Sequence, residues 1–263
     1  MKKLLNILLL LFLFSCSGNC DSLEEVSQNF NSDLEPSKIW TYYAELPIIT
    51  TQNPDWYYQF SYENGLLKRM NGKLYKMGNS GFEFYTFSQN VSTNFSYSGN
   101  QIVVEYSEND AEIKKSINTL ESGRIKKSES FDEFNNLIIT KNYSYETDKI
   151  SVHTKRYTFD TYDTYFFDSN KNLIKSEKLQ VSSNIQTRLT TTQYLNFDQA
   201  KNPYKKLYIV NDNFFIKSLS ENNFRKITYI TQNLQYPELN PGSGYSEWTY
   251  QYDADGQVIL YHQ

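Results

Sequence analysis

The chain has 263 residues with a formal net charge of −4, and it contains 23 Tyr and 17 Phe but few Pro and Gly. This acidic balance argues against the basic face that nucleic-acid-binding proteins use, so we expect no nucleic-acid partner. The composition also argues against a disordered chain, and the many Tyr, Phe, Thr and Ser favour pleated strands over helices.

The N-terminus has the layout of a cleaved export signal. Lys2 and Lys3 precede an apolar run from Leu4 to Phe14, and small residues flank Cys16. As a helix this run would extend roughly 16 Å, about half of the hydrocarbon core of a bilayer, so it is too short to span a membrane. We therefore expect residues 1–15 to be a signal peptide.

The residues Leu13-Phe14-Ser15-Cys16 resemble the bacterial lipobox, in which an aliphatic residue stands three positions before the cysteine and a small residue directly before it. The resemblance implies cleavage before Cys16, a diacylglyceryl group on its thiol and an acylated amine. Two or more acyl chains anchor a protein stably, so the expected location is the cell envelope, at the outer membrane. The alternative is a secretory signal with an incidental cysteine. Once Cys16 is acylated, Cys20 has no partner for an intramolecular disulfide.

Residues 16–39 are polar and lack a sustained period-2 pattern, so we expect a flexible tether that holds the following domain away from the lipid headgroups. Within it, Asp21-Ser22-Leu23 is similar to the acceptor of a bacterial O-glycosylation pathway. That similarity implies a glycan on Ser22.

From residue 40 to residue 263 the chain predicts an antiparallel β domain. The clearest unit is the last one, where Trp248, Tyr250 and Tyr252 alternate with polar residues before a turn. In that turn Asp253 is expected to accept a backbone N–H, and Gly256 to adopt the left-handed conformation of a type I turn with a G1 bulge.

Weaker copies of the same pattern recur along the chain. Each has an aromatic residue, an acid or Ser, a turn with Gly or Asn, and then an aliphatic residue. The copies begin at Phe60, Phe95, Leu120, Phe131, Tyr143 and Phe166. Their spacing predicts an all-β fold, a single large antiparallel meander of successive hairpins that forms a curved sheet or a partly closed barrel. The stretch from Asp110 to Leu120 also fits helical spacing, and we expect a strand there.

Two segments carry a resemblance to known families. Residues Tyr250 to Val258 look like the tyrosine-aspartate repeat of the Rhs class. Residues 197–204 (FDQAKNPY) and 219–223 (LSENN) resemble the "FD..NP" and "LS.NN" segments of Gram-negative lipoproteins of unknown function, which include a porin-like antiparallel β domain. This resemblance extends over most of residues 55–263. Those families have no known catalytic residues, so it implies none here.

Few residues suit catalysis or metal binding. The two histidines are His153, in an ordinary strand pattern, and His262, next to the chain end. The loops that start at Asp168 and Asp253 resemble fragments of calcium loops but lack the terminal bidentate Glu, so turn chemistry explains them better. We predict no catalytic residue, no metal site and no cofactor.

The hairpin pattern breaks between Pro203 and Asn223, around an apolar cluster that includes Phe214 and Phe215. In one interpretation this segment folds back and covers apolar surface of the sheet. In the other it is a mobile lid over a ligand site, which makes Phe214, Phe215 and Tyr204 the candidate binding residues. We favour the covering segment, because bulky aromatic side chains are usually packed.

The first functional hypothesis is a lipid-anchored, non-enzymatic β domain that serves interaction or envelope structure, bound to the membrane through Cys16 and to a protein, lipid or glycan partner. The alternative is a binding module or carrier for lipid or glycan, which an apolar internal cavity would favour. The second alternative is a carboxylate-based hydrolase, which requires two acids that converge in a cleft.

Overall fold

The computed structural model describes residues 34–46, 53–78, 84–108 and 111–261. The expected signal peptide, Cys16, Cys20, Ser22 and His262 lie outside these ranges. The described helices include none long and apolar enough to cross a membrane.

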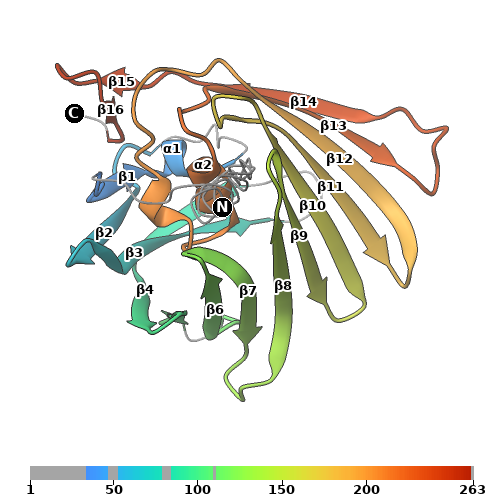
Figure 1. The fold of residues 1–263 in the computed structure, drawn as a ribbon, viewed down its shortest axis with the longest axis horizontal. Helices are drawn as coiled ribbons and strands as arrows, with labels where there is room; N and C mark the ends of the chain where they lie inside the picture. The colour runs from blue at the N-terminus through green and yellow to red at the C-terminus, as the bar shows by residue number, and fades with distance from the viewer. Residues whose placement is uncertain (1–33, 47–52, 79–83, 109–110, 262–263) are drawn as a thin grey trace, which may run out of the picture.

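The described chain forms one 14-stranded antiparallel sheet in which every strand pairs with its neighbours in sequence, and a separate two-stranded hairpin of β15 and β16. The predicted meander of hairpins is therefore confirmed, and the sheet is curved but not closed (Figure 1). The strands are β1 (Lys38–Trp40), β2 (Tyr57–Glu63), β3 (Leu66–Met77), β4 (Phe84–Ser98), β5 (Gln101–Tyr106), β6 (Lys115–Glu121), β7 (Arg124–Phe131), β8 (Leu137–Tyr145), β9 (Lys149–Arg156), β10 (Phe159–Phe167), β11 (Leu173–Ser182), β12 (Ile185–Leu195), β13 (Lys226–Asn233), β14 (Gly242–Glu247), β15 (Gln251–Tyr252) and β16 (Val258–Ile259).

Three short helices complete the described fold: α1 (Thr41–Ala44), η1 (Lys205–Leu207) and α2 (Asp212–Leu219). The sheet curls around α1 and α2, while β10 to β14 project beyond them (Figure 1). The C-terminal hairpin reaches back to the first strand, because the backbone N–H of Trp40 donates to the carbonyl oxygen of Leu260 at 2.7 Å.

The β domain starts earlier than the predicted boundary at residue 40. Lys38 and Ile39, which the sequence assigns to the tether, belong to β1 and pair with Gln59 and Tyr58. Ile39 is fully buried in the core, so hydrophobic packing already begins there. The polar composition of residues 16–39 gave no indication that Ile39 would be buried.

The predicted turn chemistry is confirmed, and it recurs. Asp253 Oδ1 accepts from the N–H groups of Asp255 and Gln257, and Gly256 has a φ of 75°. Asp168 and Asp132 make the same two bonds to the residues two and four positions later. One acidic side chain thus satisfies two turn N–H groups in each of these hairpins. The calcium-like pattern of these loops is accounted for by the turns themselves.

In the described part of the ambiguous stretch, residues 111–120, the strand begins at Lys115. In β6 the buried side chains are Ser116 and Asn118, whereas Ile117 points to the other face. The helical spacing of its aliphatic residues therefore has no structural counterpart.

The concave face of the sheet changes character along the strands. Near α2 it carries buried Tyr143 and Tyr165, whose rings contact Phe215 of the helix, and buried Tyr194, whose ring contacts Phe224. Farther along the same strands the face is polar, as in the hydrogen bond between the hydroxyls of Thr190 and Thr231 at 3.0 Å. The helical segment covers only the first part of the strands, so water reaches the rest, and polar side chains suit it.

Candidate functional site

A groove lies between the concave face of the sheet and the residues that lead into α2. It consists of a cavity of about 660 Å³ and a second one of about 440 Å³. Tyr106, Ile113, Val210 and Asn211 line both cavities, so the two are contiguous. Pockets of several hundred Å³ are the size that small-molecule ligands occupy.

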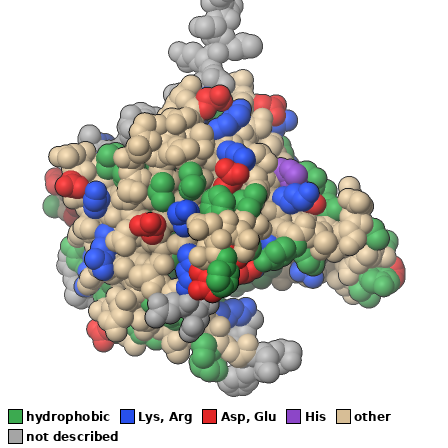
Figure 2. All heavy atoms as spheres, turned by 90° about the horizontal axis from the view of Figure 1, so that it is seen from below, with side chains coloured by type: hydrophobic (Ala, Val, Ile, Leu, Met, Phe, Trp, Pro, Cys, Tyr) green, Lys and Arg blue, Asp and Glu red, His purple; other side chains and the backbone are tan. Residues whose placement is uncertain are grey.

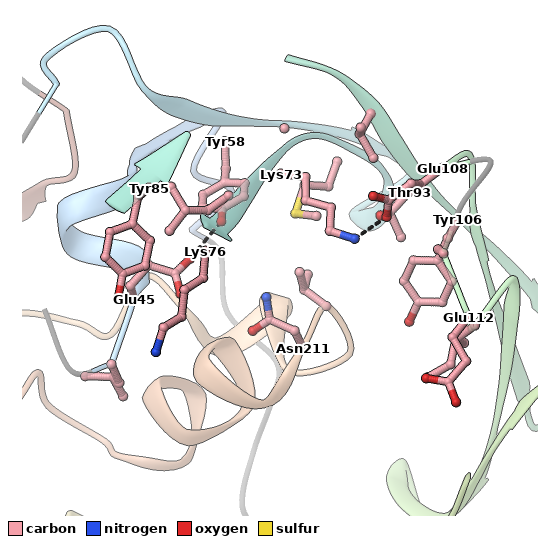
Figure 3. A pocket seen from close by; sticks show the side chains of 18 residues that line it. Glu45, Tyr58, Lys73, Lys76, Tyr85, Thr93, Tyr106, Glu108, Glu112 and Asn211 are labelled. Carbon is pink, nitrogen blue, oxygen red and sulfur yellow. Dashed lines mark hydrogen bonds and ion pairs between the residues drawn. The ribbon is translucent and has the colours of Figure 1, made fainter. Parts of the chain in front are cut away.

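The floor of the groove is set by the start of α2. Asn211 caps this helix, because its side-chain oxygen accepts from the backbone N–H of Phe214 at 3.1 Å. Such a cap satisfies one of the free N–H groups of the first turn. The capping interaction therefore fixes the position of Asn211, which lines both cavities and is shown beside the larger one in Figure 3.

A hydrogen-bonded carboxylate occupies one side of the larger cavity. Glu45 accepts from the hydroxyl of Tyr58 at 2.7 Å and from the amide of Asn213 at 2.7 Å. Burial raises the pKa of Glu45 above its ordinary value, and the two hydrogen bonds counteract part of that shift. Lys76 and Tyr85 lie on the same side in Figure 3.

The opposite side of the larger cavity carries two ion-paired glutamates. Glu108 is bound by the ammonium of Lys73. Burial of Glu108 opposes ionisation, but the hydrogen bonds from Lys73 and Tyr75 and the nearby charges of Lys73 and Lys114 together lower the pKa of that carboxyl. Glu112 is paired with Arg156 and also accepts from the hydroxyl of Tyr157 at 3.1 Å. Each carboxylate in the cavity thus already has donors.

A glycine of β3 lines the larger cavity. Gly72 lies at a register shift between β3 and β4 and has a φ of 117°. A Cβ there would lie 2.5 Å from the ring of Phe87, so only Gly lets this ring pack against the strand. The bulge increases the curvature of β3 and helps to form the concave wall.

The second cavity is more polar. Lys141, from β8, reaches across to an ion pair with Asp212 in the first turn of α2. The Asp212 carboxylate raises the pKa of Lys141 despite its burial, and Lys141 in turn lowers the pKa of Asp212. An acid in the first turn also suits the positive end of the helix. The ion pair connects α2 to the sheet.

The candidate binding residues Phe214, Phe215 and Tyr204 are core residues in the structure. Phe214 is fully buried and packs edge-on against Tyr58 and Phe60. The hydroxyl of Tyr204 donates to the carbonyl oxygen of Tyr43 at 3.0 Å. Phe215 lines the second cavity, whereas Phe214 and Tyr204 are not among the lining residues of either one. The geometry matches a segment that covers the sheet.

The two motif segments that resemble the lipoprotein family meet in space. Asp198 accepts from both the backbone N–H and the side-chain amide of Asn223. Asn202 donates to the carbonyl oxygens of Lys217 and Ser220, each at 2.7 Å. These residues hold the connection between β12 and β13 in place, so the motif has a structural role.

His153 lies on the convex face, away from the groove, as the strand alternation in β9 requires. Its Nε2 is 2.7 Å from Asp160 Oδ1, and its ring stacks on Tyr162 at 4.5 Å. Among the described residues, no cluster of His, Cys, Asp and Glu is arranged to hold a metal ion.

The sequence did not identify the groove residues Glu45, Tyr58, Lys73 and Tyr106. They come from distant parts of the chain, and each follows the ordinary alternation of its strand or turn. The one available signal was the Asn211-Asp212-Asn213 run, a typical helix start before an apolar cluster.

Comparisons with known proteins bear on the fold alone. No family model and no curated protein matches the chain. A porin-like protein from Bacteroides vulgatus has a similar crystal structure, with a TM-score of 0.50 and 14% identity over 77% of this chain and 84% of that one. A porin-like protein from Bacteroides uniformis aligns with a TM-score of 0.45 and 16% identity, over 77% of this chain and 80% of the other. The chain is thus similar in fold to porin-like proteins with an antiparallel β architecture.

Proposed function

We propose that this protein is a lipid-anchored lipoprotein of the cell envelope whose β domain is a non-enzymatic binding module, with the groove as its binding site. The observation that carries the binding role is the contiguity of the two cavities along the concave face. The anchor rests on the lipobox-like sequence that ends at Cys16, and the similarity to porin-like folds agrees with an envelope location.

The lining favours a polar ligand, and a glycan fits best. Tyr85 and Tyr106 offer aromatic rings with hydroxyls, and Lys73 and Asn211 add hydrogen-bond donors among them. Sugars present apolar C–H faces and many hydroxyls, which such a mixed wall can match. An acyl chain would require a continuous apolar wall, which the charged residues of this groove interrupt.

An oligosaccharide array followed by titration calorimetry tests the proposal. Tyr85→Ala and Tyr106→Ala should each weaken the binding of a hit roughly tenfold or more, since stacked aromatic contacts contribute on the order of 1 to 3 kcal/mol each. Tyr162→Ala, on the convex face, is the matched control and should bind as wild type does. Binding that survives both groove variants would show that the site lies elsewhere.

The carboxylate arrangement also bears on the hydrolase alternative. Glu45 has the raised pKa that a general acid needs, but its oxygens accept from Tyr58 and Asn213. We expect Glu45→Gln to keep glycan binding and to leave product formation at the background rate of the wild type. Release of reducing ends by the wild type that disappears in Glu45→Gln would replace the binding module with an enzyme.

A further inference from the structure

The two ends of the sheet differ in their turns. At one end the turns are Asn64-Gly65, Gly99-Asn100, Ser122-Gly123, residues 146–148 and residues 168–172, all built from Gly and polar residues. In this described part of the chain, no large apolar side chain in or beside those turns is more than half exposed. This is the ordinary composition of hairpin turns in water.

At the other end, four successive hairpins each display large apolar side chains. We call them the tip row: Phe134 between β7 and β8, Tyr157 and Phe159 between β9 and β10, Ile185 after the β11–β12 turn, and Tyr236 and Leu239 between β13 and β14. Each is between 55% and 76% exposed. Single exposed apolar residues need no explanation, but such side chains on consecutive tips do.

The register places these tips side by side. Phe159 pairs with Arg156 on one side and with Ser182 on the other, so neighbouring tips adjoin. The N–H of Ser183 donates to the carbonyl oxygen of Thr158 and connects two of them. Adjacent strands lie about 4.8 Å apart, so four hairpins make a row on the order of 30 Å long. Figure 1 shows these turns along one margin of the sheet, and Figure 2 shows hydrophobic side chains at its protruding end.

One tip residue has an unfavourable backbone conformation. Tyr157 has a φ of 54°, the left-handed region that Gly and Asn adopt most readily. The other described non-glycine residues with positive φ are Asn, Ser or Lys. Asn at this position would suit the turn better. The hydroxyl of Tyr157 donates to Glu112, but this bond leaves the side chain 62% exposed, so neither the turn nor the core accounts for its apolar ring.

We propose that the tip row inserts into the interfacial region of the lipid bilayer to which the protein is anchored. This inference rests on the proposed lipid anchor at Cys16, which keeps the domain beside a bilayer. Aromatic and aliphatic side chains on tips suit the boundary between headgroups and acyl chains, where Tyr contributes apolar area together with a polar hydroxyl, and Phe, Ile and Leu contribute apolar area. The strands themselves stay outside the bilayer, because they also expose charged side chains, such as Lys126 in β7 and Lys178 in β11.

The chain length permits this orientation. The described chain enters the domain at the polar end of the sheet, where Tyr62 donates to the carbonyl oxygen of Pro36 and Lys206 pairs with Glu35. The strands of the projecting half, about ten residues long, extend roughly 33 Å from there to the tips. The roughly 18 residues from Cys16 to Asp33 reach up to about 60 Å when extended. The tether is therefore long enough for anchor and tips to contact one membrane.

The charges near the tips are of both signs, so we expect a lipid contact that does not depend on net electrostatic attraction. Along the row, four basic side chains are balanced by four acidic ones: Lys115, Lys155, Arg156 and Arg188, and Glu112, Asp132, Glu133 and Glu238. Insertion should therefore occur in zwitterionic vesicles and should depend little on salt, unlike attraction to anionic lipid.

The test uses the acylated full chain reconstituted in phosphatidylcholine vesicles, with a tryptophan probe on the tip row. Phe134→Trp and Tyr236→Trp are two independent probes, and Thr147→Trp, in an exposed turn at the polar end, is the matched control. Brominated phosphatidylcholine should quench the added emission of both tip probes and shift it to the blue, while the control probe stays accessible to aqueous acrylamide.

The outcomes separate this proposal from the anchor. Tip probes that brominated lipid does not quench, in a sample whose Cys16 peptide carries acyl chains by mass spectrometry, would overturn insertion of the tip row alone and favour a protein partner for that surface. Quenched tip probes, together with mass spectrometry that finds Cys16 of the native protein unacylated, would support insertion and overturn the lipid anchor.

Discussion

The side-chain amide of Asn202 lies 2.7 Å from the carbonyl oxygen of Ser220. This hydrogen bond joins the first and the last part of the long connection between β12 and β13. The same amide nitrogen also donates to the carbonyl oxygen of Lys217, and Asn202 Oδ1 accepts from the N–H of Tyr204 at 2.8 Å. A single buried side chain thus satisfies three backbone groups of the segment that covers the concave face.

Asn202→Ala should destabilise the protein by about 3 to 5 kcal/mol, because it leaves several buried backbone groups without partners. Urea unfolding followed by circular dichroism measures the change. Asn142→Ala, at an exposed position on the convex side of β8, is the control and should lie within about 0.5 kcal/mol of wild type. Equal stabilities of the two variants would contradict a structural role for Asn202.

Phe214→Ala should lower the stability by about 3 to 5 kcal/mol, since it removes a fully buried ring that contacts Tyr58 and Phe60. Phe134→Ala, at an exposed tip, should change the thermal melting temperature little. If Phe214→Ala melted within a degree of wild type, the segment would be a lid rather than a covering element.

Lys217 makes stability depend on pH. Its Nζ is buried with no hydrogen-bond partner, near the rings of Tyr204, Phe224 and Trp248. Burial lowers its pKa to about 7 from an ordinary 10.5, and the attraction of Glu45 counteracts only part of this shift. Between these two values the unfolded chain binds more protons than the folded one, so stability should rise with pH across that window.

Lys217→Met tests this dependence, because a methionine fills the same space without a proton to bind. The variant should be more stable than wild type at about pH 6. Its advantage should shrink between about pH 7 and about pH 9, because the folded wild-type amine is then neutral and the cost of deprotonating it on folding falls as the pH approaches the unfolded-state pKa. Parallel pH profiles of the two proteins in urea unfolding would exclude Lys217 as the source.

Cys16→Ala should move the protein from the membrane fraction to the soluble fraction, because it removes the predicted acylation site. Mass spectrometry of the wild-type N-terminal peptide should show an acylated Cys16. An unmodified N-terminus at another residue would contradict the anchor.

The hairpins could be predicted from the sequence because the residues that form each hairpin are close together in the chain. The turns at Asp132, Asp168 and Asp253 occur as expected, since an acid two and four residues before free N–H groups needs no distant partner. The order of the strands followed from the same locality, because short turns leave consecutive strands no neighbour but each other. The start of the domain at Lys38 was missed, because the strand there pairs with residues that are distant in the sequence.

What the sequence determined by itself was thus the class of fold, the turns, and the aromatic cluster that has to be covered. Only the tertiary structure decided which residues form the groove and which form the tip row. Glu45, Lys73 and Tyr106 line one cavity because the sheet curves around α2. This curvature arises from the twist of the strands together with bulges such as that at Gly72. Likewise, Phe134 and Phe214 are the same residue type, and one is exposed while the other is buried because the helical segment covers one end of the sheet and leaves the other end uncovered.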